Sequence, residues 1–178
     1  VEFSGTSASA PIITGVLAAV MTQASAGRTL HPYEALEMLY AYANEAGTAG
    51  PDPLAGSGAV NLNRIFERNT PLVSDGAVAS QVFHPPTDGT IPSLEVNIQN
   101  QGTEPLVNIP IRVSTSANVS QFSITSLEPG KVHTLRVPIP PPLFGPGFQL
   151  SATTEILRSD RHPDNNRKAN TYLPPKTQ

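Results

Sequence analysis

Apolar and polar residues follow different patterns in the two halves of the chain. Residues 11–23 are apolar on nearly every side of a helical projection, which is typical of a helix buried all round. In residues 32–44 the apolar positions recur at three- and four-residue spacing, which predicts an amphipathic helix. Pro11 and Pro32 lie near the expected starts, where a missing N–H costs nothing. A Gly/Pro loop (47–58) and a short apolar element (60–66) follow.

Beyond residue 75 the pattern changes to a period of two. Leu94, Val96 and Ile98 point to one face and the polar residues between them to the other, as in a half-buried strand. Residues 109–113, 132–137 and 148–156 repeat this behaviour between turns. Short strands at such intervals predict an antiparallel immunoglobulin-like sandwich. We therefore expect two parts, a helical segment (1–68) and an all-β sandwich (76–178), joined by a linker (69–75).

Composition narrows the classes of function. A net charge of -3 with 11 Lys+Arg argues against nucleic-acid binding. No run of 18–20 apolar residues is present, so we expect no membrane span. The absence of cysteine excludes disulfides, thiolate metal sites and a cysteine nucleophile. The sequence begins with Val1, and we expect it to be a piece of a longer protein.

One short stretch suggests chemistry. Residues 5–11 read Gly-Thr-Ser-Ala-Ser-Ala-Pro, so that Ser7 follows a tight Gly5–Thr6 turn and enters the buried helix. A hydroxyl there lies near backbone N–H groups without intrahelical acceptors, a position that suits attack on a carbonyl and stabilises an oxyanion. The alternative is that Ser7 or Ser9 is a helix N-cap, as serines commonly are.

The pattern Gly-Thr-Ser-x-Ser-x-Pro resembles the nucleophile region of subtilisin-like serine proteases. The resemblance continues through the two helices to Gly-Ser-Gly-Ala-Val-Asn at residues 56–61, which is similar to the element closing many subtilase domains. It implies that residues 1–68 are the helical, C-terminal end of an α/β catalytic domain. Ser7 would be the nucleophile and its N–H would contribute to the oxyanion hole, with Gly5 and Thr6 shaping the turn and Pro11 opening the helix.

The same resemblance implies that this chain is incomplete as a catalyst. In the family the catalytic Asp and His precede the Ser, so these groups and the oxyanion Asn would lie before Val1. None of the four histidines fits the family pattern, and we interpret His31, His84, His133 and His162 as structural or solvated. The expected partners are the upstream part of the protease, in the same polypeptide or a cleaved companion chain, and a protein or peptide substrate.

The second part resembles the CARDB-type domains of bacterial surface proteins. The similarity lies in residues 96–102, 127–130 and 164–171, which match a strand-turn opening, a mid-domain turn and a closing loop. It implies an extracellular or cell-surface, bacterial protein. No cofactor is expected. Asp160 and Asp164 are weak candidates for calcium ligands, since Asp and Asn oxygens bind calcium on loops but are also ordinary turn residues.

Two classes of function remain at this stage. The first is a secreted subtilisin-like endopeptidase whose C-terminal portion, with an accessory sandwich, supplies the nucleophile and is inactive alone. The second is a non-catalytic surface binding or spacer protein with a degenerate protease remnant.

Overall fold

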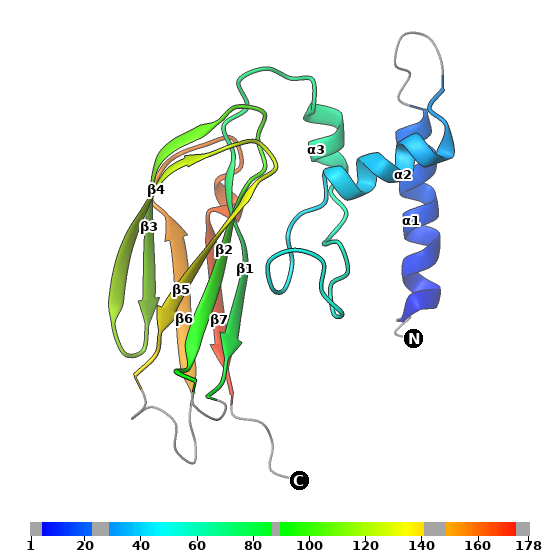
Figure 1. Ribbon diagram of the computed structural model, residues 1–178. Helices are drawn as coiled ribbons and strands as arrows, with labels where there is room; N and C mark the ends of the chain where they lie inside the picture. Colours follow the sequence, from blue (N-terminus) through cyan, green and yellow to red (C-terminus); the bar gives the residue numbers. More distant parts are fainter. Residues whose placement is uncertain (1–4, 23–28, 87–89, 141–148, 174–178) are drawn as a thin grey trace.

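The chain folds into a small helical part beside a β-sandwich (Figure 1). The computed structural model describes residues 5–22, 29–86, 90–140 and 149–173 of the 178-residue chain. Within them the helices are α1 (Thr6–Met21), α2 (Pro32–Ala41) and α3 (Leu62–Glu67). They pack around a cluster of buried side chains, namely Val20, Leu30, Ala35, Leu39 and Ile65.

The helices α2 and α3 begin at well-formed caps. His31 Nδ1 accepts from the Tyr33 N–H while Glu34 accepts from the His31 N–H at 2.7 Å, a reciprocal capping box. Asn61 caps α3 by accepting from the N–H groups of residues 63 and 64. The interpretation of His31 as a structural residue is therefore confirmed.

The first helix starts earlier than the sequence pattern predicts. We expected it to open at Pro11, but α1 begins at Thr6 and contains Pro11 in its interior. Gly5 is the N-cap, with φ 93°, and its carbonyl accepts from the N–H groups of Ala8 and Ser9. Glycine tolerates this backbone conformation without steric cost, so the helix can start there. Pro11 remains compatible because its fixed φ suits a helix, although it leaves the Ser7 carbonyl without the usual partner.

Most of α1 lies open within the described part of the chain. Val20 is its one buried residue, and Ile12 is 65% exposed. Ile13, Val16 and Leu17 pack only partly against the cluster around Val20. The described part of the chain therefore does not bury residues 11–21 on all sides, as was expected for residues 11–23.

The second part is an antiparallel sandwich of two sheets. One sheet has the order β1-β2-β5 and the other β4-β3-β6-β7. Every neighbouring pair is antiparallel. The predicted β-sandwich is thus confirmed, and its strands are β1 (Gly76–His84), β2 (Ser93–Asn100), β3 (Leu106–Thr115), β4 (Val119–Leu127), β5 (Val132–Pro138), β6 (Leu150–Ile156) and β7 (Arg167–Tyr172).

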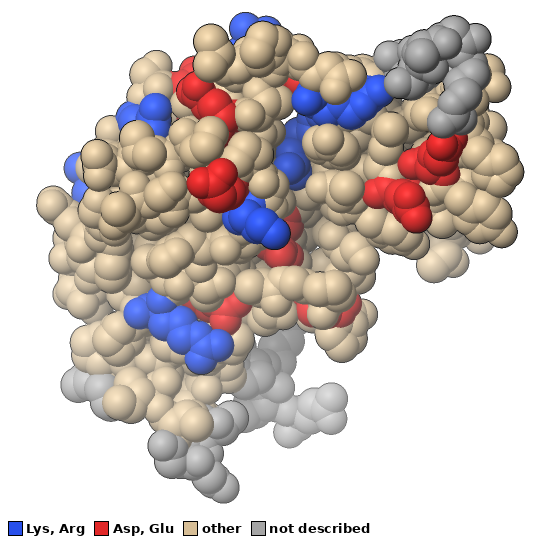
Figure 2. All heavy atoms as spheres, turned by 45° about the horizontal axis from the view of Figure 1, so that its top comes forward, with Lys and Arg blue, Asp and Glu red and all other residues tan. Residues whose placement is uncertain are grey.

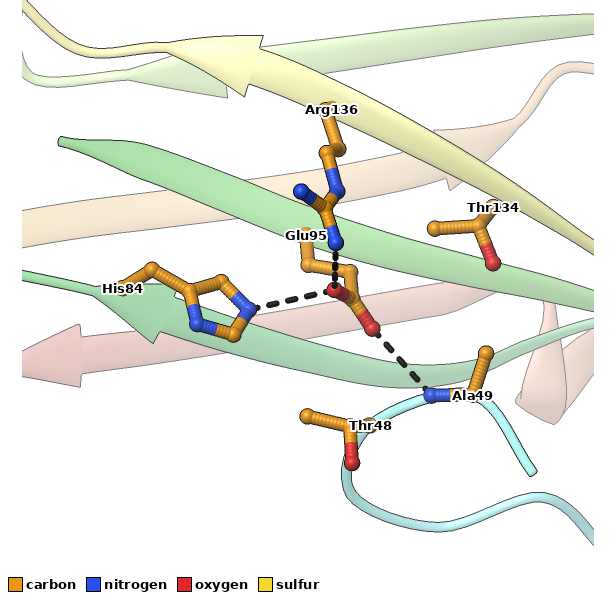
Figure 3. A pocket seen from close by; sticks show the side chains of 6 residues that line it. All are labelled: Thr48, Ala49, His84, Glu95, Thr134 and Arg136. Atoms are coloured by element: carbon orange, nitrogen blue, oxygen red, sulfur yellow. Dashed lines mark hydrogen bonds and ion pairs between the residues drawn. The ribbon is translucent and has the colours of Figure 1, made fainter. Parts of the chain in front are cut away.

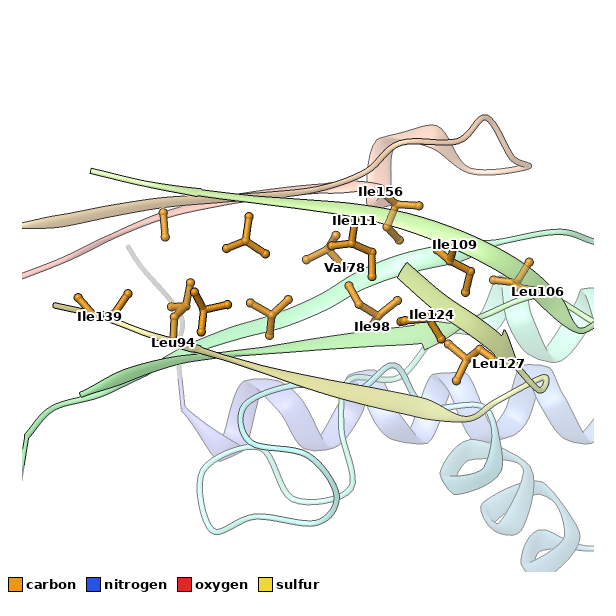
Figure 4. Close-up of a cluster of buried hydrophobic side chains, with 14 of the residues drawn as sticks. Val78, Leu94, Ile98, Leu106, Ile109, Ile111, Ile124, Leu127, Ile139 and Ile156 are labelled. Carbon is orange, nitrogen blue, oxygen red and sulfur yellow. The ribbon is translucent and has the colours of Figure 1, made fainter. Parts of the chain in front are cut away.

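The sandwich core lies between the sheets (Figure 4). Leu94, Val96 and Ile98 point inward as their alternation predicts, and all three are fully buried. Ile109, Ile111 and Val113 do the same from β3 on the facing sheet. Burial of each such side chain contributes roughly 1.5–3 kcal/mol. This cluster holds the strands that carry the polar groups described below.

Residues 69–75 run from α3 into β1 and lie against the sandwich. The Val73 carbonyl accepts from the N–H of Thr103 at 2.8 Å, and the Asp75 carbonyl accepts from Gln101 N–H at 2.8 Å. A side chain on Gly102 would collide with the Val73 carbonyl. Glycine at position 102 therefore allows this segment to approach the turn between β2 and β3.

Candidate functional site

Ser7 lies in the first turn of α1. The turn begins at Gly5, and Ser7 is exposed to solvent. Its N–H lies in the first turn, where backbone donors lack the usual acceptor four residues earlier in the helix, and at the positive end of the helix dipole. An exposed hydroxyl beside such donors can reach a carbonyl carbon while the carbonyl oxygen meets N–H groups.

The capping alternative for the serines is wrong. Gly5 occupies the N-cap position and no side chain caps the helix. Ser9 Oγ instead donates to the Gly5 carbonyl at 3.3 Å, four residues back. Ser9 is thus tied to the turn, and Ser7 presents its hydroxyl to solvent.

The structure places His31 far from Ser7. The N–H of Leu30 donates to the carbonyl of Met21, which puts His31 at the C-terminal end of α1. Met21 lies fourteen positions after Ser7 along the helix, a distance of about 20 Å. The other three histidines belong to the sandwich. The sandwich and α1 lie on opposite sides of the molecule (Figure 1). Within the described residues, no histidine is in reach of Ser7.

The calcium candidates do not form a shared site. Asp160 accepts from Gly76 N–H at 2.9 Å through one oxygen and from Asn166 Nδ2 at 3.1 Å through the other. Asp164 is exposed on the short helix η2 (Pro163–Asn165). Among the residues that the structure describes, no group of three or more His, Asp or Glu residues could hold a metal ion.

A polar seam joins the helical part to the sandwich. The outward-facing side chains of β2 are buried beneath residues 43–50. Asn97 Nδ2 donates to the Gly47 carbonyl at 3.2 Å, and Gln99 Nε2 donates to the Ala43 carbonyl at 3.2 Å. Gln99 Oε1 accepts in turn from the N–H of Glu45 at 3.0 Å. The expectation of a half-buried strand is wrong here, because a second segment covers the polar face.

Glu95 is the buried charge of this seam. Its Oε1 accepts from Ala49 N–H and from Asn97 Nδ2, both at 3.2 Å, and its Oε2 lies 3.1 Å from His84 Nε2 and 3.4 Å from Arg136 Nη2. Burial works to raise the pKa of Glu95, but the hydrogen bonds from Ala49, Asn97 and His84 outweigh burial and hold the pKa below its usual value. The carboxylate is therefore ionised, with four donors arranged around it.

An open hollow of about 520 Å³ lies above Glu95 (Figure 3). His84 and Arg136 approach the carboxylate from different sides, and Thr134 lies beyond it on β5. Thr48 and Ala49 complete the wall from the helical part. The hollow is consequently formed only where the two parts meet.

A second polar cluster lies between α3 and the sandwich. Arg64 and Asp75 face a small cavity of about 60 Å³, and both residues are buried. Arg64 Nη1 donates to the carbonyls of Tyr42 and Ala43, whereas its Nε has no partner in the described part of the chain. Asp75 accepts from Asn165 Nδ2 at 2.8 Å.

The environment of Asp75 favours its protonated form. Burial raises the pKa of Asp75, and the nearby charge of Asp160 acts in the same direction. The Asn165 hydrogen bond and the charges of His162 and Arg64 oppose these effects without cancelling them. Asp75 is thus a buried carboxyl immediately before β1.

Replacing Asp75 with asparagine is expected to stabilise the protein at neutral pH. A carboxyl whose folded pKa is raised binds more protons when folded, so its contribution becomes unfavourable as pH rises from the unfolded pKa through the folded one. Asp75→Asn removes this penalty and leaves an acceptor for Asn165. Urea unfolding at pH 7 and pH 3.5 should show a gain in unfolding free energy only at pH 7. An equal or larger gain at pH 3.5 would contradict the raised pKa of Asp75.

Sequence patterns missed both polar clusters, because their members are far apart in the chain. Glu95, His84 and Ala49 come from three separate segments, and nothing in their local spacing marks them. One signal for the first cluster is present in the sequence. Residues 95, 97 and 99, on one face of β2, are Glu, Asn and Gln, and all three can form hydrogen bonds with a covering segment.

Charged side chains of both signs are mixed on the face shown in Figure 2, without a large patch of one sign. None of the described helices is both long and apolar enough to cross a membrane.

Comparison with known proteins gives a distant likeness for the sandwich. No family model and no curated protein matches the sequence. Among solved structures, the chain is similar to the solution NMR structure of a domain from Methanosarcina acetivorans that is provisionally described as part of a cell surface protein. The two share 15% sequence identity with a TM-score of 0.48, over 60% of this chain and 96% of that domain.

Proposed function

We propose that this chain is the C-terminal portion of a secreted, subtilisin-like serine endopeptidase, in which Ser7 is the nucleophile. The observation that carries the proposal is the position of Ser7, exposed in the first turn of α1 directly after the positive-φ residue Gly5. The Gly-Thr-Ser-x-Ser-x-Pro pattern of residues 5–11 lies across this turn. A serine so placed has both the access and the neighbouring N–H donors that acyl transfer requires.

In the proposed reaction Ser7 Oγ attacks the scissile carbonyl of a protein or peptide substrate. A histidine outside this chain takes the hydroxyl proton and later gives it to the leaving amine, and water then resolves the acyl-enzyme. The Ser7 N–H contributes to the oxyanion hole, together with an asparagine outside this chain. Because a serine without a base is a poor nucleophile at neutral pH, this chain alone is inactive.

The exposed apolar surface of the helical part favours the presence of a protein partner that covers it. Ile12 on α1 is largely exposed. An apolar groove is lined by Ile13, Leu36, Tyr40 and Val60 among others. Apolar surface gains free energy when it is removed from water, at roughly 25 cal/mol per Å². In the proposal the upstream part of the protease covers this surface and carries the catalytic Asp and His.

The sandwich is the accessory module of the proposed enzyme, of CARDB type, and the location is extracellular or at a bacterial cell surface. A second candidate function is a non-catalytic surface binding or spacer protein with a degenerate protease remnant. The observation favouring it is that the described residues place no base near Ser7, whereas the sandwich contributes most of the lining of a polar hollow.

An active-serine probe tests the proposal. The polypeptide isolated from its native source, incubated with a fluorophosphonate and digested, should yield a peptide with the adduct on Ser7. The 178-residue chain alone should remain unlabelled, because the base is missing. Ser9 lies in the same peptide with a hydrogen-bonded hydroxyl and serves as the internal control. Absence of an adduct on Ser7 in the native polypeptide would favour the non-catalytic alternative.

A further inference from the structure

The hollow above Glu95 has a fixed arrangement of donors and acceptors, and none of it is used by the proposed protease chemistry. Its floor is the Glu95 carboxylate, whose side chain is 4% exposed and whose oxygens already accept from four donors. Glu95 therefore has no free lone pair for a ligand. Its role is to hold His84 and Arg136 in place at the rim.

Arg136 supplies the donors of the hollow. One guanidinium N–H group contacts Glu95 Oε2 at 3.4 Å, and the side chain is 72% exposed. Its remaining N–H groups have no partner among the described residues. Because the carboxylate lies below and the guanidinium above, an entering molecule meets positive charge first. A guanidinium fork recognises a carboxylate through two parallel hydrogen bonds.

The other free groups are acceptors. Thr134 Oγ1 donates its hydrogen to Asn97 at 2.7 Å, and Thr48 Oγ1 donates to Asp52 at 3.3 Å, so both oxygens keep free lone pairs. His84 contacts Glu95 through Nε2, and in the tautomer that carries its proton on this nitrogen Nδ1 is an acceptor. These groups fit a ligand that carries an anionic group together with several hydroxyl donors.

We propose that this hollow binds an acidic sugar, a uronic-acid residue of a saccharide, with its carboxylate on Arg136 and its hydroxyl groups on Thr48, Thr134 and His84. A uronate places one carboxylate and several hydroxyl groups on a single ring, which matches both sets of groups. Sulfate lacks hydroxyl donors, phosphate carries its one or two hydroxyl groups on the anionic group itself, and an acidic peptide presents its backbone donors only once per residue. The hollow has the size of small-molecule sites.

The site depends on the contact between the two parts of the chain. Thr48 and Ala49 come from the helical part, and the remaining lining residues come from the sandwich. The seam formed by Asn97 and Gln99 holds these walls together. The inference is independent of the role of Ser7, so the two can fail separately.

Titration calorimetry of the full 178-residue chain with trigalacturonate tests the proposal. We expect saturable binding at micromolar to millimolar concentrations, and binding at least about tenfold weaker to the methyl ester, which keeps the hydroxyl groups but masks the charge. Arg136→Met should weaken binding by about tenfold or more. Arg167→Met is the matched control, because Arg167 is also exposed and pairs with a glutamate, Glu155, but lies on β7.

Several outcomes would overturn the proposal. These are the absence of saturable binding, equal binding of the methyl ester, and an unchanged affinity in Arg136→Met with an unchanged circular dichroism spectrum. Triglutamate binding as tightly as trigalacturonate would assign the hollow to acidic peptides. A loss in Arg167→Met equal to that in Arg136→Met would show a nonspecific charge effect.

Discussion

Replacing Ser7 with alanine is expected to lower peptide hydrolysis by the complete polypeptide about 10⁴- to 10⁶-fold in kcat. The substitution removes the oxygen that forms the acyl-enzyme, while the helix start at Gly5 keeps its backbone. Substrate affinity should change little, because α1 and its N–H groups remain. The measurement is the rate of cleavage of a fluorogenic peptide by the polypeptide purified with and without the substitution.

Ser9→Ala is the matched control for that experiment. Ser9 lies two residues after Ser7 near the start of α1, and its hydroxyl donates to the Gly5 carbonyl. Its loss is expected to change hydrolysis by less than about tenfold, because it affects only the rigidity of the turn. Hydrolysis that persists in Ser7→Ala, or an equal loss in Ser9→Ala, would contradict the assignment of the nucleophile.

The sequence pattern predicts the sandwich well because strand alternation is a local property. Leu94, Val96 and Ile98 are buried as their spacing requires. Strand β4 is not predicted by this alternation, because its two buried apolar residues, Ile124 and Leu127, are three positions apart. The period of two is therefore broken on the strand that lies at the edge of its sheet.

The candidate sites show where local patterns end. The turn around Ser7 is contiguous, so its motif is visible in the sequence, although the start of α1 depends on the backbone of Gly5 rather than on Pro11. The hollow above Glu95 requires residues 48, 84 and 136 to meet. Such contacts follow from the packing of the two parts, and no spacing along the chain encodes them. Glu95 was expected on an open face for the same reason.

Replacing Asn97 with alanine is expected to destabilise the protein by about 2–4 kcal/mol and to loosen residues 43–50 selectively. Asn97 is fully buried and connects four groups: its Nδ2 shares two hydrogens among Gly47, Ser80 and Glu95, and its Oδ1 accepts from Thr134 at 2.7 Å. Alanine removes these bonds from a buried seam and leaves the Thr134 hydroxyl without its acceptor, while Gly47 still accepts from Ser80 and Glu95 keeps three donors. Hydrogen exchange followed by mass spectrometry should show faster exchange for the peptide covering residues 43–50.

Asn100→Ala separates this local effect from a general loss of stability. Asn100 is the same residue type on the same strand and is equally buried, but its side chain bonds to the carbonyls of Glu104 and Leu127 and to Gly102 N–H, all within the sandwich. Its loss should lower the unfolding free energy comparably while residues 43–50 keep their protection. If both variants exposed that peptide equally, its protection would follow global stability alone. If only Asn97→Ala exposed it, the seam would be what holds the helical part on the sandwich, and the hollow above Glu95 would depend on it.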